Sequence, residues 1–282
     1  MQHGNSEESA PLEWRAPSAS PSQIKSLTTS QDDREEIVIE ALDHLMLRAS
    51  FRDGAVGAYE TLLGRRAEDG RLRLGNVGLA IEDHASTAHL SAMVFATASL
   101  DKAQRLLERR AVPSERIGDR LMLSTRATHL VPIVLMERTA TPEPLPLLQS
   151  SEAASITALD HVVIRTPDPE RAIALYAGRL GLDLRLDRSN PDWGSRLLFF
   201  RCGDLVVEIA HDLKNGVSAG PDQLWGLSWR TPDIGRCNER LKKAGVEVSE
   251  PRNGRRPGSQ VFSVQSHTAN VPTIVIGGIG RW

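Results

Sequence analysis

Two side chains in the second half of the chain, His161 and Glu208, have the residue types that bind a divalent metal. In an extended strand the alternation of side chains places His161, Val163 and Arg165 on one face. Glu208 is flanked by valine and isoleucine, and a carboxylate in such surroundings should not be buried without a partner. Both side chains can contact one ion only if their strands are neighbours, since such strands lie about 4.8 Å apart.

Arginines and tryptophans in the same half have the chemistry of a ligand pocket. Arg252, Arg255 and Arg256 crowd a segment rich in glycine and proline, and guanidinium groups suit a carboxylate or a phosphate. The same composition fits an ordinary hairpin connection with solvated charges. Trp193 and Trp225 are candidates for the wall of a pocket. His211 and His267 are further candidates for metal ligands, although His211 is expected on the face opposite Glu208. Trp229 and Cys237 are expected in the core.

An internal repeat indicates which elements must position these residues. The tetrapeptide Ala41-Leu42-Asp43-His44 recurs at Ala158-Leu159-Asp160-His161, an offset of 117, and the match continues through the following helix. Asp168 and Pro169 predict the start of that helix, and Gly181 predicts its end. A second register, with an offset of 134, relates Phe95 to Trp229 and again covers a strand and a helix. Each half therefore reads β-α-β-β-β twice.

The predicted strands and turns define the domains. In the second half strands are expected near residues 182–188, 195–201, 204–210, 261–264 and 273–276, with a turn at 190–194. Residues 1–36 are rich in serine, proline and acidic residues and predict a disordered tail. Residues 37–138 form a first domain and residues 157–279 a second, joined by a proline-rich linker at 139–156. The fold class is α+β with mixed sheets.

Composition excludes several kinds of partner and site. The formal net charge of −2 gives no reason to expect a nucleic acid, and no apolar run approaches the length that crosses a bilayer. Two cysteines, Cys202 and Cys237, make neither a disulfide framework nor a thiolate metal site and fit a reducing compartment. We therefore expect a cytoplasmic protein with a small-molecule ligand, and a homo-oligomer is compatible with the sequence.

The order of these motifs resembles the vicinal oxygen chelate superfamily, which includes glyoxalases, extradiol dioxygenases, epimerases and bleomycin-resistance proteins. The motifs are a strand with Leu-Asp-His, an Asp-Pro helix ending in Leu-Gly, and a strand with Val-Val-Glu. The resemblance implies that paired βαβββ units curl into cups around a divalent metal, with ligands from the first and fourth strands of each unit. It places His161 and Glu208 at two of those positions, and Gly226 and Ile274 at the other two, where no side chain can bind a metal.

The first half departs further from the pattern. His44 remains, but Ala80, Ala92 and Val134 occupy the other three positions, so we expect no metal there and read His44 as a structural strand histidine.

The leading hypothesis is a divalent-metal-dependent enzyme with one site in the second half. His161 and Glu208 would hold the metal. The substrate would be a small, oxygen-chelating and acidic molecule, contacted by Arg165, Trp193, Trp225, Arg252, Arg255 and Arg256. The alternatives are a His–Glu hydrogen bond in a non-catalytic binding protein, resembling bleomycin-resistance proteins, and an extradiol dioxygenase. The latter needs a second histidine that is absent from its expected place.

Overall fold

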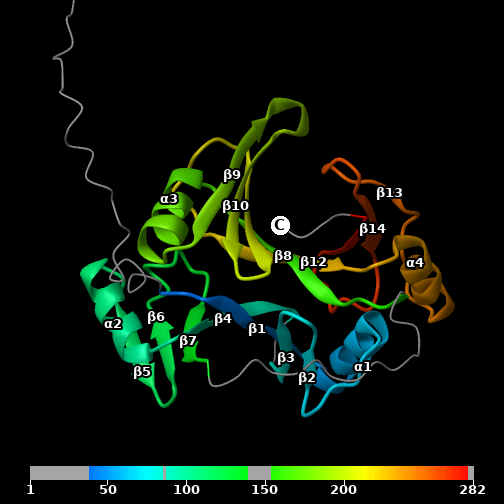
Figure 1. Ribbon diagram of the computed structural model, residues 1–282, viewed down its shortest axis with the longest axis horizontal. Helices are drawn as coiled ribbons and strands as arrows, with labels where there is room; N and C mark the ends of the chain where they lie inside the picture. Colours follow the sequence, from blue (N-terminus) through cyan, green and yellow to red (C-terminus); the bar gives the residue numbers. More distant parts are fainter. Residues whose placement is uncertain (1–37, 85–86, 139–153, 279–282) are drawn as a thin grey trace, which may run out of the picture. The chain divides into compact units, whose positions relative to one another are not determined.

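The protein folds into two mixed β sheets, as seen in a computed structural model that describes residues 38–84, 87–138 and 154–278 (Figure 1). The first sheet has seven strands in the order β2-β3-β1-β4-β7-β6-β5, and the second has eight in the order β13-β14-β15-β12-β8-β11-β10-β9. The expected α+β fold with tandem sheets is confirmed. The tail at 1–36 and all but the end of the linker at 139–156 lie outside the described residues. No helix in the described ranges is long and apolar enough to span a membrane.

In both halves each unit begins with a strand followed by a helix. The first half comprises β1 (Ala41–Ala49), α1 (Arg52–Leu63), β2 (Arg71–Arg73), β3 (Gly78–Asp83), β4 (His89–Thr97), α2 (Leu100–Arg109), β5 (Ser114–Ile117), β6 (Arg120–Leu123) and β7 (Ile133–Glu137). The second comprises β8 (Ala158–Arg165), α3 (Pro169–Ile173), η3 (Ala174–Arg179), β9 (Asp183–Asn190), η4 (Pro191–Trp193), β10 (Ser195–Cys202), β11 (Leu205–Asp212), β12 (Gln223–Arg230), α4 (Ile234–Lys243), β13 (Arg252–Asn253), β14 (Gln260–Val264) and β15 (Thr273–Gly277).

The helix boundaries follow the predicted capping residues. The Asp168 side chain accepts a hydrogen bond of 3.1 Å from the backbone N–H of Arg171, and Pro169 occupies the first turn of α3. Gly181 has a φ of 78°, which glycine adopts without steric cost. The π-helical turn η3 that continues α3 was not predicted.

The central strands of the second sheet bring the two units together. Strand β8 pairs in parallel with β11 and antiparallel with β12, and β12 pairs in parallel with β15. Figure 1 shows β8 and β12 at the centre, with β9 and β10 on one side and β13 and β14 on the other. The first sheet repeats this pattern, since β1 is parallel to β3 and antiparallel to β4.

One unit differs from the predicted β-α-β-β-β order. Its helix α1 is followed by only two strands, β2 and β3, before the next unit begins at β4. The reason is length: residues 64–77 separate α1 from β3, whereas residues 180–204 separate η3 from β11 in the second half. The longer segment accommodates the additional strand β9, so the prediction of three strands after α1 was wrong.

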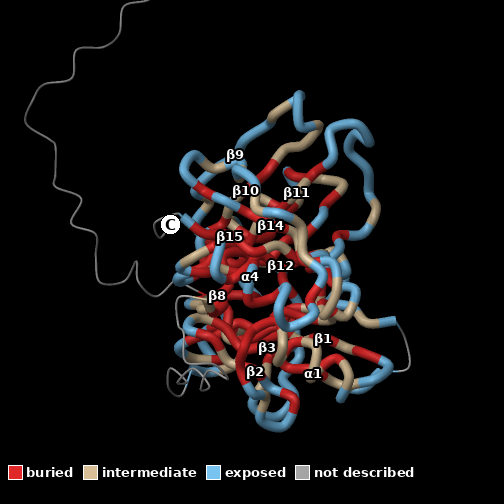
Figure 2. The backbone as a smooth tube through the Cα atoms, turned by 90° about the vertical axis from the view of Figure 1, so that its right-hand side faces the viewer, coloured by how far each residue is buried: buried red, intermediate tan, exposed pale blue. Residues whose placement is uncertain are grey.

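Buried side chains from both sheets form one continuous hydrophobic cluster. It includes Tyr59 and Phe95 from the first half and Tyr176, Trp229 and Cys237 from the second, each fully buried. Trp229 and Cys237 are thus core residues, as predicted. In Figure 2 the buried backbone runs through the central strands, whereas the β9 hairpin is largely exposed.

Candidate functional site

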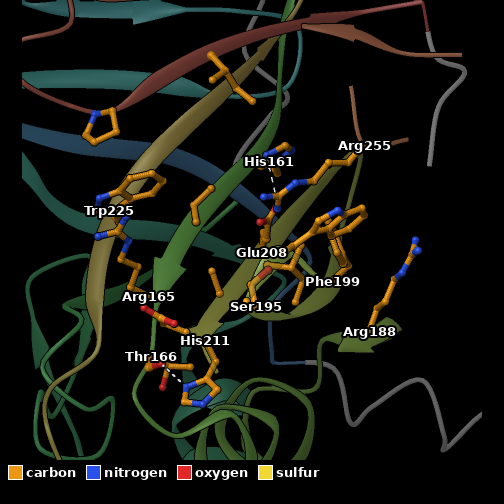
Figure 3. A pocket seen from close by; sticks show the side chains of 18 of the residues that line it. His161, Arg165, Thr166, Arg188, Ser195, Phe199, Glu208, His211, Trp225 and Arg255 are labelled. Carbon is orange, nitrogen blue, oxygen red and sulfur yellow. Dashed lines mark hydrogen bonds and ion pairs between the residues drawn. The ribbon is translucent and has the colours of Figure 1, made fainter. Parts of the chain in front are cut away.

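The second sheet surrounds a cavity of about 1130 Å³. Its floor is formed by β8, β11, β12 and β15, and its sides by the β9–β10 hairpin and the segment after β13 (Figure 3). Both His161 and Glu208 line it. All six residues that the sequence suggested for substrate binding also line it: Arg165, Trp193, Trp225, Arg252, Arg255 and Arg256.

The structure brings His161 and Glu208 together. Parallel pairing places Val206 opposite His161 and Glu208 opposite Val163, so the two side chains lie on one face of adjacent strands. The distance from His161 Nε2 to Glu208 Oε2 is 3.3 Å, and the two side chains are only 11% and 13% exposed. The pair is therefore a nearly buried imidazole–carboxylate contact at the cavity floor.

Asp160 holds the other side of the imidazole ring. Its Oδ2 lies 2.9 Å from His161 Nδ1, and its Oδ1 accepts a bond of 3.3 Å from Arg230 Nε. Burial is the largest single influence on the pKa of His161 and lowers it, but the carboxylates of Glu208 and Asp160 together outweigh burial and raise the pKa above 6.5. A protonated His161 can thus donate to both carboxylates.

The opposite unit supplies no matching metal ligands. Helix caps Asp168 and Asp233 differ by 65 in number, and the same offset relates His161 to Gly226. A Cβ at Gly226 would lie 2.8 Å from the carbonyl oxygen of Pro272, so a histidine there would require the backbone to move. Ile274 occupies the remaining position.

The described residues fit a cation with two protein ligands. The 3.3 Å between Nε2 and Oε2 is the separation that two ligands of one ion would have, at bonds of about 2.0–2.2 Å. No group of three or more histidine, cysteine, aspartate or glutamate side chains that could hold a metal occurs in the described part of the chain. The ring of His211 instead contacts the carbonyl of Thr166 at 3.1 Å, and His267 contacts Ser266 at 2.9 Å.

The equivalent place in the first sheet lacks the acid. His44 contacts Asp43 at 2.6 Å between Nδ1 and Oδ1, and Ala80 pairs with Met46 just as Glu208 pairs with Val163. The register therefore confirms the equivalence of Ala80 and Glu208, and His44 has the structural hydrogen bond that was expected of it.

Cationic and aromatic side chains line the rest of the cavity. The Arg165 guanidinium lies 3.9 Å from the centre of the Trp225 ring. Near the mouth, Arg188 and Arg255 lie 5.0 and 4.8 Å from the ring of Trp193, so this contact joins the β9–β10 hairpin to the segment after β13. The lining has six cationic and three acidic side chains: Arg165, Arg188, Lys214, Arg252, Arg255 and Arg256 against Asp160, Glu208 and Asp212. This balance favours an acidic ligand.

Sequence reasoning missed Asp160, Arg188 and Lys214 in this lining. A signal for Asp160 was present, because the repeated Leu-Asp-His places an aspartate before the histidine in both halves. A signal for Arg188 was also present, because Leu182, Leu184 and Leu186 alternate along the predicted strand 182–188 and Arg188 follows Leu186 by two residues. Lys214 lies in an exposed loop, whose sequence does not show which way the side chain points.

Residues 160–262 match the model of the Glyoxalase/Bleomycin resistance protein/Dioxygenase superfamily. The ethylmalonyl-CoA/methylmalonyl-CoA epimerase of Cereibacter sphaeroides is 30% identical over 109 residues, which cover 35% of this chain and 81% of the epimerase. The chain belongs to this superfamily.

Two solved structures share this fold. A halotolerant catechol dioxygenase superposes with a TM-score of 0.66 at 13% identity, over 88% of this chain and 89% of the dioxygenase. The Mn(II)-bound glyoxalase of Novosphingobium aromaticivorans gives 0.65 at 12% identity, over 86% and 83% of the two chains. At such identities the likeness concerns the fold and not the reaction.

Proposed function

We propose that this superfamily member is an enzyme that acts on a small acidic molecule bound in the cavity of the second sheet. The observation that carries the proposal is the line Asp160–His161–Glu208, with contacts of 2.9 and 3.3 Å, at the floor of a cavity with a cationic lining. Buried, mutually oriented titratable groups in a cleft favour a functional site over a structural one.

Proton transfer is the chemistry that these side chains can perform themselves. Asp160 fixes the ring by its contact with Nδ1 and directs Nε2 into the cavity. His161 can donate the Nε2 proton to a substrate oxygen, and the Glu208 carboxylate can accept a proton from a neighbouring carbon or water. The epimerase relative supports proton transfer as the type of reaction, since removing and returning a proton is one way to invert a carbon centre.

A divalent cation would be held by His161 and Glu208, with water or substrate as its other ligands. When bound it would act as a Lewis acid and polarise a substrate oxygen. The outer contact of Asp160 with His161 is the type of support that metal-binding histidines have. Two protein ligands make a weak site, so we expect the cation to be lost easily on purification.

A second candidate is a binding protein without catalysis. The observation that favours it is the pair Gly226 and Ile274, which leaves the opposite strands without a metal ligand or a base. An extradiol dioxygenase is disfavoured for the same reason, because its iron requires two histidines and a carboxylate.

Metal titration of chelator-treated protein distinguishes these candidates. Mn²⁺, Co²⁺ and Zn²⁺ are titrated calorimetrically into the wild type, His161→Ala and Glu208→Gln. The matched control is His44→Ala, which removes the equivalent histidine of the first sheet. We expect stoichiometric binding that is lost in the first two variants and retained in the control. Binding that survives in both variants would refute the ligand assignment, and no binding by the wild type would favour the binding protein.

A further inference from the structure

Three arginines occupy equivalent positions in the repeated strands. Arg48 in β1, Arg165 in β8 and Arg230 in β12 each stand four residues after the position of His44, His161 or Gly226. The repeat therefore places the three arginines at equivalent positions of their strands, and each has equivalent neighbouring positions that can hold a partner.

The strand pairing around these arginines is also repeated. The pairing of β8 with β12 skips Asp160 on one strand and Trp225 on the other, and that of β1 with β4 skips Asp43 and Ser91. A residue skipped in this way forms a bulge, which redirects its side chain. Asp160 and Trp225 are thus symmetry-related residues, each presented to the arginine of the neighbouring strand.

Two of the three arginines are neutralised within the protein. Arg230 contacts Asp160 at 3.3 Å and Asp204 at 3.4 Å. Arg48 lies 3.8 Å from Glu82, its direct cross-strand partner.

Arg165 has no such carboxylate among the described residues. Where Arg230 meets Asp160, Arg165 meets the ring of Trp225 at 3.9 Å. Its cross-strand partner is Ala210, whereas that of Arg48 is Glu82. Where the other two arginines meet an acidic residue, Arg165 meets the uncharged Trp225 and Ala210, and its guanidinium lines the cavity (Figure 3).

We propose that Arg165, stacked on Trp225, is the subsite that binds the oxyanion of the ligand, a carboxylate or a phosphate. The ligand then supplies the charge that Glu82 and Asp160 supply to the other two arginines. The stack fixes the plane of the guanidinium and leaves its N–H edge available for two parallel hydrogen bonds. This inference rests on the proposed function, in that it assumes an acidic ligand in the cavity.

The position of Arg165 also constrains the shape of the ligand. His161 and Arg165 share a face of β8 and are four residues apart, about 13 Å along the strand. We therefore assign the oxyanion to Arg165 and the reacting centre to His161 as two separate groups of the ligand. The ligand has an acidic end that anchors it and a separate reacting centre.

The sharpest test returns an internal carboxylate to Arg165. Ala210→Glu reproduces the Arg48–Glu82 pair of the first sheet without removing the arginine, and Arg165→Gln removes the charge itself. The matched control, Glu82→Ala, breaks the pair in the first sheet and leaves the cavity intact. Malonate and inorganic phosphate are titrated separately at low ionic strength, with calorimetry and tryptophan fluorescence as readouts. Circular dichroism and melting curves establish that each variant is folded.

We expect the wild type to bind at least one probe saturably, and the preferred probe to identify the oxyanion. Its affinity should fall at least tenfold in both Ala210→Glu and Arg165→Gln and stay unchanged in Glu82→Ala. Unchanged affinity in folded Arg165→Gln, or no saturable binding by the wild type, would overturn the inference. Arg255→Ala and Arg256→Ala are titrated in the same way, and if binding falls only in these two variants, the cavity takes an acidic ligand elsewhere. The inference then fails, while the proposed function still depends on the separate metal titration.

Discussion

His161 and Glu208 face each other from two parallel, hydrogen-bonded strands, with 3.3 Å between Nε2 and Oε2. The pKa of His161 is raised because the Glu208 and Asp160 carboxylates outweigh the effect of burial. The folded state therefore binds this proton more tightly than the unfolded chain does. The contribution of this proton to the unfolding free energy is fully present below about pH 6.5 and is lost as pH rises through the raised pKa of His161.

The stability difference between the wild type and His161→Gln should follow this pH dependence. Urea unfolding of both metal-free proteins from about pH 5.5 to 8.5 measures it. We expect the advantage of the wild type to be largest at the acidic end and to shrink toward the basic end. An advantage that grows with pH would mean that the folded state holds His161 neutral.

Asp160→Asn should have two separate effects. The substitution removes the charge that both His161 Nδ1 and Arg230 Nε contact. We expect the pKa of His161 to fall, as measured by NMR of its ring protons, because one of the carboxylates that raise it is gone. We also expect a loss of about 3 kcal/mol in unfolding free energy, since the substitution breaks a buried ion pair.

The control for this prediction is Asp204→Asn. Asp204 contacts the same arginine at 3.4 Å, but its side chain is 45% exposed. Its loss should cost less than about 1 kcal/mol and leave the pKa of His161 unchanged. Equal effects of the two substitutions would show that Asp160 has no special role in the site.

Much of this arrangement was predictable because the repeat constrains it. The Leu-Asp-His motif and the Val-Val-Glu strand identified His161 and Glu208, and the register of β3 against β1 confirms that Ala80 is the counterpart of Glu208. These positions lie in buried strands, where alternation of apolar residues determines which way a side chain points.

Other features were outside the reach of the sequence because they depend on three-dimensional packing. The carbonyl of Pro272 approaches Gly226 across strands, and this contact makes a ligand at that position sterically unfavourable. The contact of Arg165 with Trp225 arises from a bulge, and a bulge shifts the alternation on which the prediction relied.

Both cysteines should be unreactive in the folded protein. Burial raises the pKa of the Cys202 thiol to about 12, and burial also raises the pKa of Cys237. We expect an aromatic disulfide reagent at about pH 8 to modify neither thiol in the native state and both in urea. Rapid native modification of one equivalent would show that one cysteine is accessible and would remove it from the core.

Arg240 should contribute strongly to the contact between the two halves. From helix α4 it donates to the carbonyls of Thr61 and Leu62 at 3.0 and 2.7 Å, and to that of Ala154 at 2.9 Å. The first two carbonyls belong to the last turn of α1. Carbonyls in the last turn of a helix have no backbone N–H partner within the helix, so their hydrogen bonds must come from elsewhere. Arg240→Met keeps the apolar stem and leaves these acceptors buried. We expect it to lower the unfolding free energy by about 3 kcal/mol, since hydrogen bonds from charged donors are the stronger ones.

Two further variants test whether the planar guanidinium is the cause. Arg240→Lys keeps the charge but cannot span acceptors on both sides, so it should recover less than half of the loss. Arg236→Met removes an arginine from the same helix, whose side chain is 67% exposed and pairs with Asp233 at 3.5 Å. That change should stay within about 0.5 kcal/mol of the wild type. If Arg240→Met and Arg236→Met lowered the unfolding free energy equally, the three carbonyl contacts would have no measurable part in holding the two sheets together.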